Sequence, residues 1–194
     1  MRYGLLFAIT LACLSLASAL TAKDVQLIAE IKQATEQANQ QLLQGHLKFL
    51  IQVNEYIAGS QVVDQSIIRQ LRSQKLRAEA KLAMHRLKES DLDEILDEWE
   101  RILDVNNING DQRRERIFLY LKDKYGDIFN MNEQRLQRQI QVFTYAINPK
   151  IRELSKSAQQ SEHELITSFN NVAYAGLVSP EESFTDFVTV MNKY

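Results

Sequence analysis

Histidines close to carboxylates are the residues of this 194-residue chain with the most obvious capacity for chemistry, because together they can bind zinc. His163-Glu164 begins the pattern of a zinc-protease helix, which needs a second histidine four residues later, and Thr167 stands there instead. His85 and Glu89 are also four residues apart and are expected to share one face of a helix. Two ligands do not hold a metal, so the sequence predicts neither a metal nor a cofactor.

The segment from Asp104 to Glu115 has the length of an EF-hand calcium loop, with an acid at each end. Its glycine, Gly110, is the seventh residue rather than the sixth, and Ile108 stands where a ligand is needed. We therefore expect an ordinary loop between helices, with a turn at Asn109-Gly110. The chain has no nucleophile elbow, phosphate-binding loop or dinucleotide fingerprint, and the sequence predicts a protein that is not an enzyme.

Charge is strongly segregated along the middle of the chain. Residues 69–88 carry seven basic side chains against Glu79, and residues 89–104 carry eight acidic side chains against Arg101. A basic amphipathic helix can meet an anionic membrane or partner. Alternatively, the acidic helix folds beside the basic one, and the near cancellation of the two charges favours this internal pairing. The candidate interaction surface comprises Arg69, Arg72, Lys75, Arg77, Lys81, Arg86 and Lys88.

The N-terminus has the layout of a secretory signal peptide. Arg2 supplies a positive charge, residues 5–16 form an apolar stretch, and small residues follow. Two cleavage positions fit, one after Ala19 and one after Ala22. A membrane anchor is the alternative, but the apolar core is short for a membrane span. We expect residues 1–22 to be removed and the protein to be secreted into the extracellular space.

The mature chain, residues 23–194, is predicted to be a single domain. Its 172 residues (194 minus 22) suit one hydrophobic core, and it has no cysteine, because Cys13 is the one cysteine of the chain. Its net charge is −3, from 22 basic residues (23 minus Arg2) and 25 acidic ones. So small a charge gives no drive toward nucleic acid. The mature chain has no run long enough to form a transmembrane segment.

Apolar residues recur at three- and four-residue steps through most of the mature chain, and glycine and proline are scarce. This pattern predicts an all-α fold, an elongated antiparallel bundle of about six amphipathic helices. The expected helices cover residues 23–58, 64–88, 90–103, 111–129, 132–175 and 179 onward. Asp64, Ser90 and Asp111 are expected to be N-caps, and Ser179 is expected to cap a helix that starts at Pro180.

Within these helices, several residues predict how the bundle packs. Gly45 marks a close contact between helices or a weak point. Leu76 and Phe118 are expected to face inward, and Trp99 is expected to be a packing anchor. In the long helix 132–175 one apolar stripe keeps its phase throughout, and Pro149 is expected to cause a kink.

Two classes of function remain open. The first is a secreted interaction protein that presents helix faces to a protein partner or to a second copy of itself. The second is an extracellular carrier of lipid or another apolar ligand. In its cysteine-poor helical layout the mature chain resembles the exchangeable apolipoproteins of insect haemolymph, and this resemblance is one of architecture. It implies helices that open to place their apolar faces on lipid.

Overall fold

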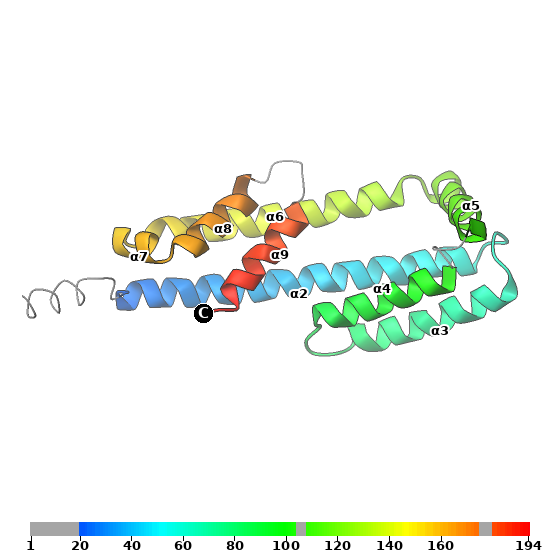
Figure 1. Ribbon diagram of the computed structural model, residues 1–194, viewed down its shortest axis with the longest axis horizontal. Coiled ribbons are helices and arrows are strands. Elements are labelled where there is room, and N and C mark those ends of the chain that lie inside the picture. Colours follow the sequence, from blue (N-terminus) through cyan, green and yellow to red (C-terminus); the bar gives the residue numbers. More distant parts are fainter. Residues whose placement is uncertain (1–19, 104–107, 175–179) are drawn as a thin grey trace, which may run out of the picture. The chain divides into compact units, whose positions relative to one another are not determined.

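The computed structural model describes residues 20–103, 108–174 and 180–194, with side chains described for residue 112 onward in α5. These residues form an all-α structure, and no strand occurs among them (Figure 1). The described helices are α2 (Ala22–Ala58), α3 (Gln65–Leu82), α4 (Glu89–Leu103), α5 (Ile108–Tyr125), α6 (Ile128–Glu153), α7 (Lys156–Ser161), α8 (His163–Tyr174) and α9 (Pro180–Met191).

The chain forms two compact units. The inserted unit is Ala38–Gln139, and the terminal unit combines the described residues up to Gln37 with those of Ile140–Tyr194. The long helices α2 and α6 each contribute one part to the terminal unit and the other part to the inserted unit. Each unit is a bundle of helices around its own apolar interior. That the two units behave as one domain stays a prediction.

Four phenylalanines lie at the centre of the terminal unit. Phe143 of α6 meets Phe184 of α9 edge-on, with 5.1 Å between the ring centroids, and it also contacts Phe187 at 5.9 Å. Phe169 of α8 contacts Phe187 at 6.1 Å. All four are at most 5 % exposed.

The apolar stripe predicted for residues 132–175 is confirmed, because its members are all buried: Leu136, Ile140, Phe143, Ile147, Ile151, Leu154, Ala158, Leu165, Phe169 and Val172.

The single helix expected over residues 132–175 is wrong, because the stripe continues through three separate helices. The helix α6 ends at Glu153, four residues after Pro149, and α7 begins at Lys156. Ser155 caps α7 by accepting the N–H of Ala158 on its hydroxyl. The N–H and O–H of Ser155 are donated in turn to the carboxylate of Asp24, on α2 of the same unit. A tertiary contact therefore stabilises the break.

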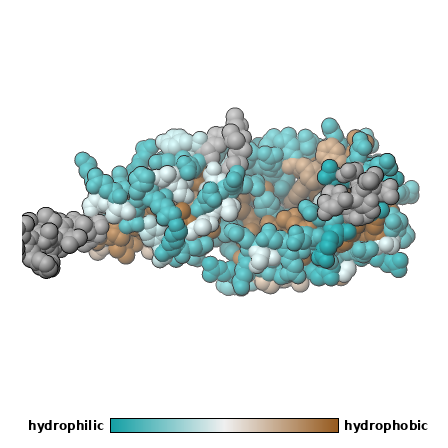
Figure 2. Space-filling view, in the orientation of Figure 1, coloured by the Kyte–Doolittle hydropathy of each residue, from teal (hydrophilic) through white to brown (hydrophobic). Residues whose placement is uncertain are grey.

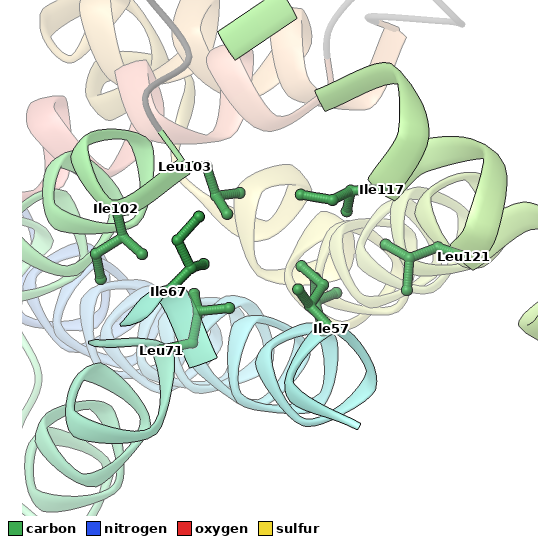
Figure 3. Close-up of a cluster of buried hydrophobic side chains, with 8 residues drawn as sticks. Ile57, Ile67, Leu71, Ile102, Leu103, Ile117 and Leu121 are labelled. Carbon is green, nitrogen blue, oxygen red and sulfur yellow. The ribbon is translucent and has the colours of Figure 1, made fainter. Parts of the chain in front are cut away.

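Helices α3 and α4 pack against one another in the inserted unit and cover one side of its part of α2 (Figure 1). One buried cluster joins Leu43, Leu47 and Leu50 of α2 to Ala78, Leu87 and Ile95. A second cluster lies where α3, α4 and α5 meet α2, and most of its members are labelled in Figure 3. Its members are Val53, Ile57, Ile67, Leu71, Ile102, Leu103, Ile117 and Leu121.

The start of α3 was predicted correctly, and its end was not. Asp64 is the N-cap, and its carboxylate accepts the N–H groups of Ser66 and Ile67. The helix ends at Leu82 rather than Lys88. Leu76 is 66 % exposed, so its predicted inward position is wrong. The buried face of α3 instead carries Ile67, Ile68, Leu71, Gln74 and Ala78.

The predicted capping of α4 by Ser90 is also wrong, because the helix begins one residue earlier, at Glu89. Asp91, in its first turn, accepts the backbone N–H of Lys88 on its carboxylate at 2.9 Å. The carboxylate of Asp91 also accepts a hydrogen bond from Lys81 of α3. The capping hydrogen bond is therefore a local one over three residues, and the bond from Lys81 joins the same carboxylate to α3.

Helix α5 begins at Ile108, so Asn109-Gly110 lies in its first turn rather than in a loop, and Asp111 is not its cap. It ends at Tyr125, before the expected residue 129, because Gly126 adopts a φ of 73° that favours glycine. At Gly45 the close contact is confirmed. A Cβ there would stand 3.3 Å from the Leu136 side chain, and the Gly45 carbonyl accepts a hydrogen bond from Arg135.

Helix α9 starts at Pro180, as predicted. Some predictions fall outside the described residues. They concern the expected cap Ser179, the signal segment up to the cleavage residue Ala19, and Asp104 of the calcium-like segment. Among the helices that the structure describes, none combines the length and the apolar character needed to cross a bilayer.

Candidate functional site

A chain of buried hydrogen bonds fixes the side chain of Trp99 in the inserted unit. The indole N–H of Trp99 donates to the side-chain carbonyl of Asn54 on α2 at 2.9 Å. The Asn54 amide donates to Gln74 of α3, and the Gln74 amide donates to the backbone carbonyl of Ile95 on α4, both at 2.6 Å. Asn54 is 2 % exposed and Gln74 is 0 % exposed. Buried polar groups are costly unless they are paired, so these hydrogen bonds fix the positions of α2, α3 and α4 relative to one another.

Trp99 also lines a pocket of about 620 Å³ in the inserted unit. The described lining comes from α4, α5 and the first turn of α6. It consists of Trp99, Leu103, Arg114, Glu115, Ile117, Phe118, Leu121 and Phe129. Most of these side chains are apolar, and the indole N–H is occupied by Asn54. The pocket therefore presents an apolar wall backed by the cluster of Figure 3, to which Leu103, Ile117 and Leu121 belong.

Aromatic rings form one side of this pocket. Phe118 and Phe129 are stacked with 5.9 Å between their centroids, and Phe129 meets Phe49 of α2 edge-on at 5.4 Å. Phe118 is 44 % exposed. The prediction that it faces inward is therefore wrong in part, because its ring lines a solvent-accessible pocket instead of filling the core. An exposed aromatic at a pocket is typical of a binding site.

Two opposite charges, Arg114 and Glu115, stand among the apolar residues of the lining. Both residues are exposed, so their charged groups remain hydrated. Figure 2 shows a mainly hydrophilic surface, with apolar atoms in the part of the view where Figure 1 places α5. Such a site can bury an apolar ligand body while the ligand's polar end stays close to water.

The basic segment of α3 contacts acidic side chains of the same unit. Lys81 has its pKa raised by hydrogen bonds to Asp91 and Glu94, at 2.6 and 2.8 Å. The described ion pairs of the segment are Lys75 with Glu55 and Glu79, Arg77 with Glu98, and Lys81 with Asp91 and Glu94. Arg69, Arg72, Arg86 and Lys88 of the candidate interaction surface are exposed.

The turn that follows α3, within the basic segment, is linked to α2 by a pair of hydrogen bonds. Gln40 donates to the carbonyl of Leu87 at 2.7 Å and accepts the Leu87 N–H at 2.8 Å. His85 lies in this turn and Glu89 begins α4, so the expectation that they share one helix face is wrong. His163 contacts Thr167 at 3.3 Å. In the described part of the chain, no three acidic, histidine or cysteine side chains gather closely enough to hold a metal.

The sequence predicted Trp99 as a packing anchor and did not predict the pocket that this residue lines. Its lining residues come from three helices, α4, α5 and α6, so no single stretch of the sequence contains the site. One signal was available: the segment expected as the fourth helix carries four aromatic residues, Phe118, Tyr120, Tyr125 and Phe129. Comparison with known proteins adds no guide, since no family model, curated protein or solved structure is significantly similar to this chain.

Proposed function

We propose that this protein is a secreted carrier that binds a small apolar ligand, such as a single-chain lipid, and that it performs no catalysis. The observation that supports the proposal is the aromatic-lined pocket of about 620 Å³ in the inserted unit. Small-molecule sites generally have volumes of roughly 300–1,000 Å³, mainly apolar walls and a few polar groups. The pocket has all three properties.

The energetics of such a ligand are those of apolar burial. Each methylene removed from water contributes about 0.8 kcal/mol, so about ten buried methylenes contribute roughly 8 kcal/mol. Association costs at least about 4 kcal/mol in lost freedom of motion. The balance corresponds to weak or moderate binding, which suits a carrier that must release its ligand. A charged ligand end would remain in water beside Arg114 and Glu115.

The test uses the fluorescence of Trp99, which is the one tryptophan of the chain and lines the pocket. The protein is titrated with palmitate and, separately, with hexadecanol, which has the same tail and no charge. We expect saturable changes in the emission of Trp99 with both compounds. If neither compound changes the emission or appears bound in native mass spectrometry, the carrier proposal is wrong.

A matched pair of variants on α5 separates the pocket from the surrounding surface. Phe118→Ser removes a lining ring that is 44 % exposed, and we expect binding to weaken about tenfold, which corresponds to about 1.4 kcal/mol. Leu119→Ser changes the next residue, which is 55 % exposed and is not part of the described lining. This control should bind like the unchanged protein. Equal effects of both substitutions would place the ligand elsewhere.

A second candidate function is contact between the exposed face of α3 and a protein partner or a second copy of the chain. Leu76 is 66 % exposed, and Arg72 and Arg69 are exposed one and two turns before it. In such a contact Leu76 would supply the apolar centre and the arginines the polar rim. Native mass spectrometry of the protein and of Leu76→Glu tests self-association. A monomer at all concentrations in both proteins argues against the homodimer.

A further inference from the structure

The first turn of α2 carries a complete capping box that begins at Thr21. The Thr21 hydroxyl accepts the backbone N–H of Asp24 at 3.1 Å. In return, the Asp24 carboxylate accepts the backbone N–H of Thr21 at 3.0 Å and its hydroxyl at 2.6 Å. The carbonyl of Thr21 accepts the N–H of Val25 at 3.0 Å. Thr21 is therefore the N-cap of α2, and Asp24 is the third residue of the helix.

The same carboxylate links this box to the break between α6 and α7. Asp24 accepts the N–H of Ser155 at 2.8 Å and its hydroxyl at 2.9 Å, and it is only 1 % exposed. The four donors come equally from Thr21 and Ser155. These hydrogen bonds, with that of the Ser155 N–H as the largest cause, lower the pKa of Asp24 to about 2. A buried carboxylate that loses half of its donors is destabilised.

The two cleavage positions that fit the signal peptide differ in what they leave of this box. Cleavage after Ala22 removes Thr21 and with it the cap of α2. It also places a new α-ammonium group on Lys23, in the first turn of α2, where the helix dipole disfavours positive charge. Cleavage after Ala19 retains Thr21 in the mature chain and places the new charge on Leu20, one residue before the cap.

We infer that the signal peptide is removed by hydrolysis of the Ala19–Leu20 bond, so that Thr21 remains as the cap of α2 in the mature protein. This inference rests on the secretion that the proposed function includes. In the reaction, a signal peptidase adds water across the amide. Ala19 leaves as a carboxylate on the peptide, and Leu20 keeps the nitrogen as its free α-amino group. Ala17 and Ala19 then occupy the two small-residue positions that such an enzyme reads.

The deciding experiment expresses the full chain in a secreting host and determines the N-terminus of the protein in the medium, by intact mass and N-terminal sequencing. We expect the sequence to begin Leu-Thr-Ala-Lys-Asp, from residue 20. A start at Lys23 overturns the inference and leaves secretion supported. A cell-bound chain that keeps its first residues overturns both the inference and the secretion, while ligand binding at the pocket is still tested separately by Trp99.

A stability measurement tests the reason for the inference. Thr21→Ala removes the capping hydroxyl. The control is Lys23→Gln, two residues after Thr21, which removes the exposed ion pair of Lys23 with Glu153. Loss of an N-cap should lower the thermal midpoint by roughly 2–4 °C, whereas the control should change it little. Equal midpoints for Thr21→Ala and the unchanged protein would show that the cap gives no advantage to the longer mature chain.

Discussion

The phenylalanines of the two units have different environments. In the terminal unit, Phe184 and Phe187 are 2 % and 0 % exposed, and α9 places both of them against Phe143. In the inserted unit, Phe118 is 44 % exposed and, with Phe129, lines a pocket. The same residue type on amphipathic helices thus forms a closed core in one unit and a candidate binding surface in the other. What differs is whether a further helix packs over the rings.

The largest expected effect comes from removing one of the buried phenylalanine rings of the terminal unit. Phe187→Ala should lower the free energy of unfolding by about 3–5 kcal/mol, because it leaves a cavity in a fully buried site. Phe118→Ala, the matched change in the inserted unit, should cost less than about 1 kcal/mol. Urea denaturation followed by circular dichroism measures both values. Similar losses for the two variants would contradict the distinction between core and pocket.

The same experiment sharpens the comparison when Trp99 fluorescence is recorded in parallel, because Trp99 belongs to the inserted unit. If Phe187→Ala lowers the fluorescence and dichroism midpoints equally, the two units unfold together, as the predicted single domain requires. A shift confined to dichroism would show that the units unfold independently.

A smaller loss is expected from Asn54→Leu in the inserted unit. This change leaves the indole N–H of Trp99 and the Gln74 side-chain carbonyl without their partner, which costs about 1–3 kcal/mol. It should also change the emission spectrum of Trp99. Gln52→Leu is the control, because Gln52 donates to Tyr56 at an exposed position. Chemical denaturation that finds the two variants equally stable would show that the buried chain of hydrogen bonds is unimportant.

The polar lock of the terminal unit, Asp24 with Thr21 and Ser155, predicts a dependence on pH. The folded-state pKa of Asp24 is about 2, below its usual value of 3.8, so its charged form stabilises the fold above about pH 4. This contribution is lost as the pH falls from 3.8 toward 2. Asp24→Asn should therefore be less stable than the unchanged protein at pH 7, and the two thermal midpoints should converge near pH 2. A constant difference across this range would contradict the assignment.

The smallest effect is expected at the ion pairs between α3 and α4. Arg77→Gln removes the ion pair with Glu98, in which the Arg77 side chain is 52 % exposed and the Glu98 side chain 21 % exposed. This change should lower the free energy of unfolding by less than about 1 kcal/mol. The loss should shrink further at high salt, because salt screens exposed charges. Thermal denaturation at two salt concentrations checks this. A large, salt-independent loss would mean that the pairing of the basic and acidic helices is a main determinant of the fold.

Periodicity predicted the features that depend on local spacing. The all-helical fold, the extent of α2 and the buried stripe from Leu136 to Val172 follow from apolar residues at helical steps, and Asp64 was identifiable as a cap by its type. The box at Thr21 and Asp24 has an equally local signature, which the expected helix start at Lys23 passed over.

One error occurred where a distant contact decides the local structure. Ser155 interrupts a helix because Asp24, 131 positions away in the chain, accepts its two donors. Two other errors have local causes that apolar periodicity does not register: the carboxylate of Asp91 accepts the N–H of Lys88 at the start of α4, and Gly126 ends α5 through its positive φ. The pocket is lined by residues of three helices, α4, α5 and α6, and therefore it became visible only with the tertiary structure.

The bond from Arg135 to the carbonyl of Gly45 has a consequence for biosynthesis. It joins α2 to α6 near the two ends of the inserted unit, at 2.9 Å. During translation the whole inserted unit leaves the ribosome before Ile140 does, so this bond can form first. The terminal unit must bring together segments separated by the entire inserted unit, and closing so long a loop costs entropy. A folded insert has already met much of that cost, and its folding should precede and accelerate completion of the terminal unit.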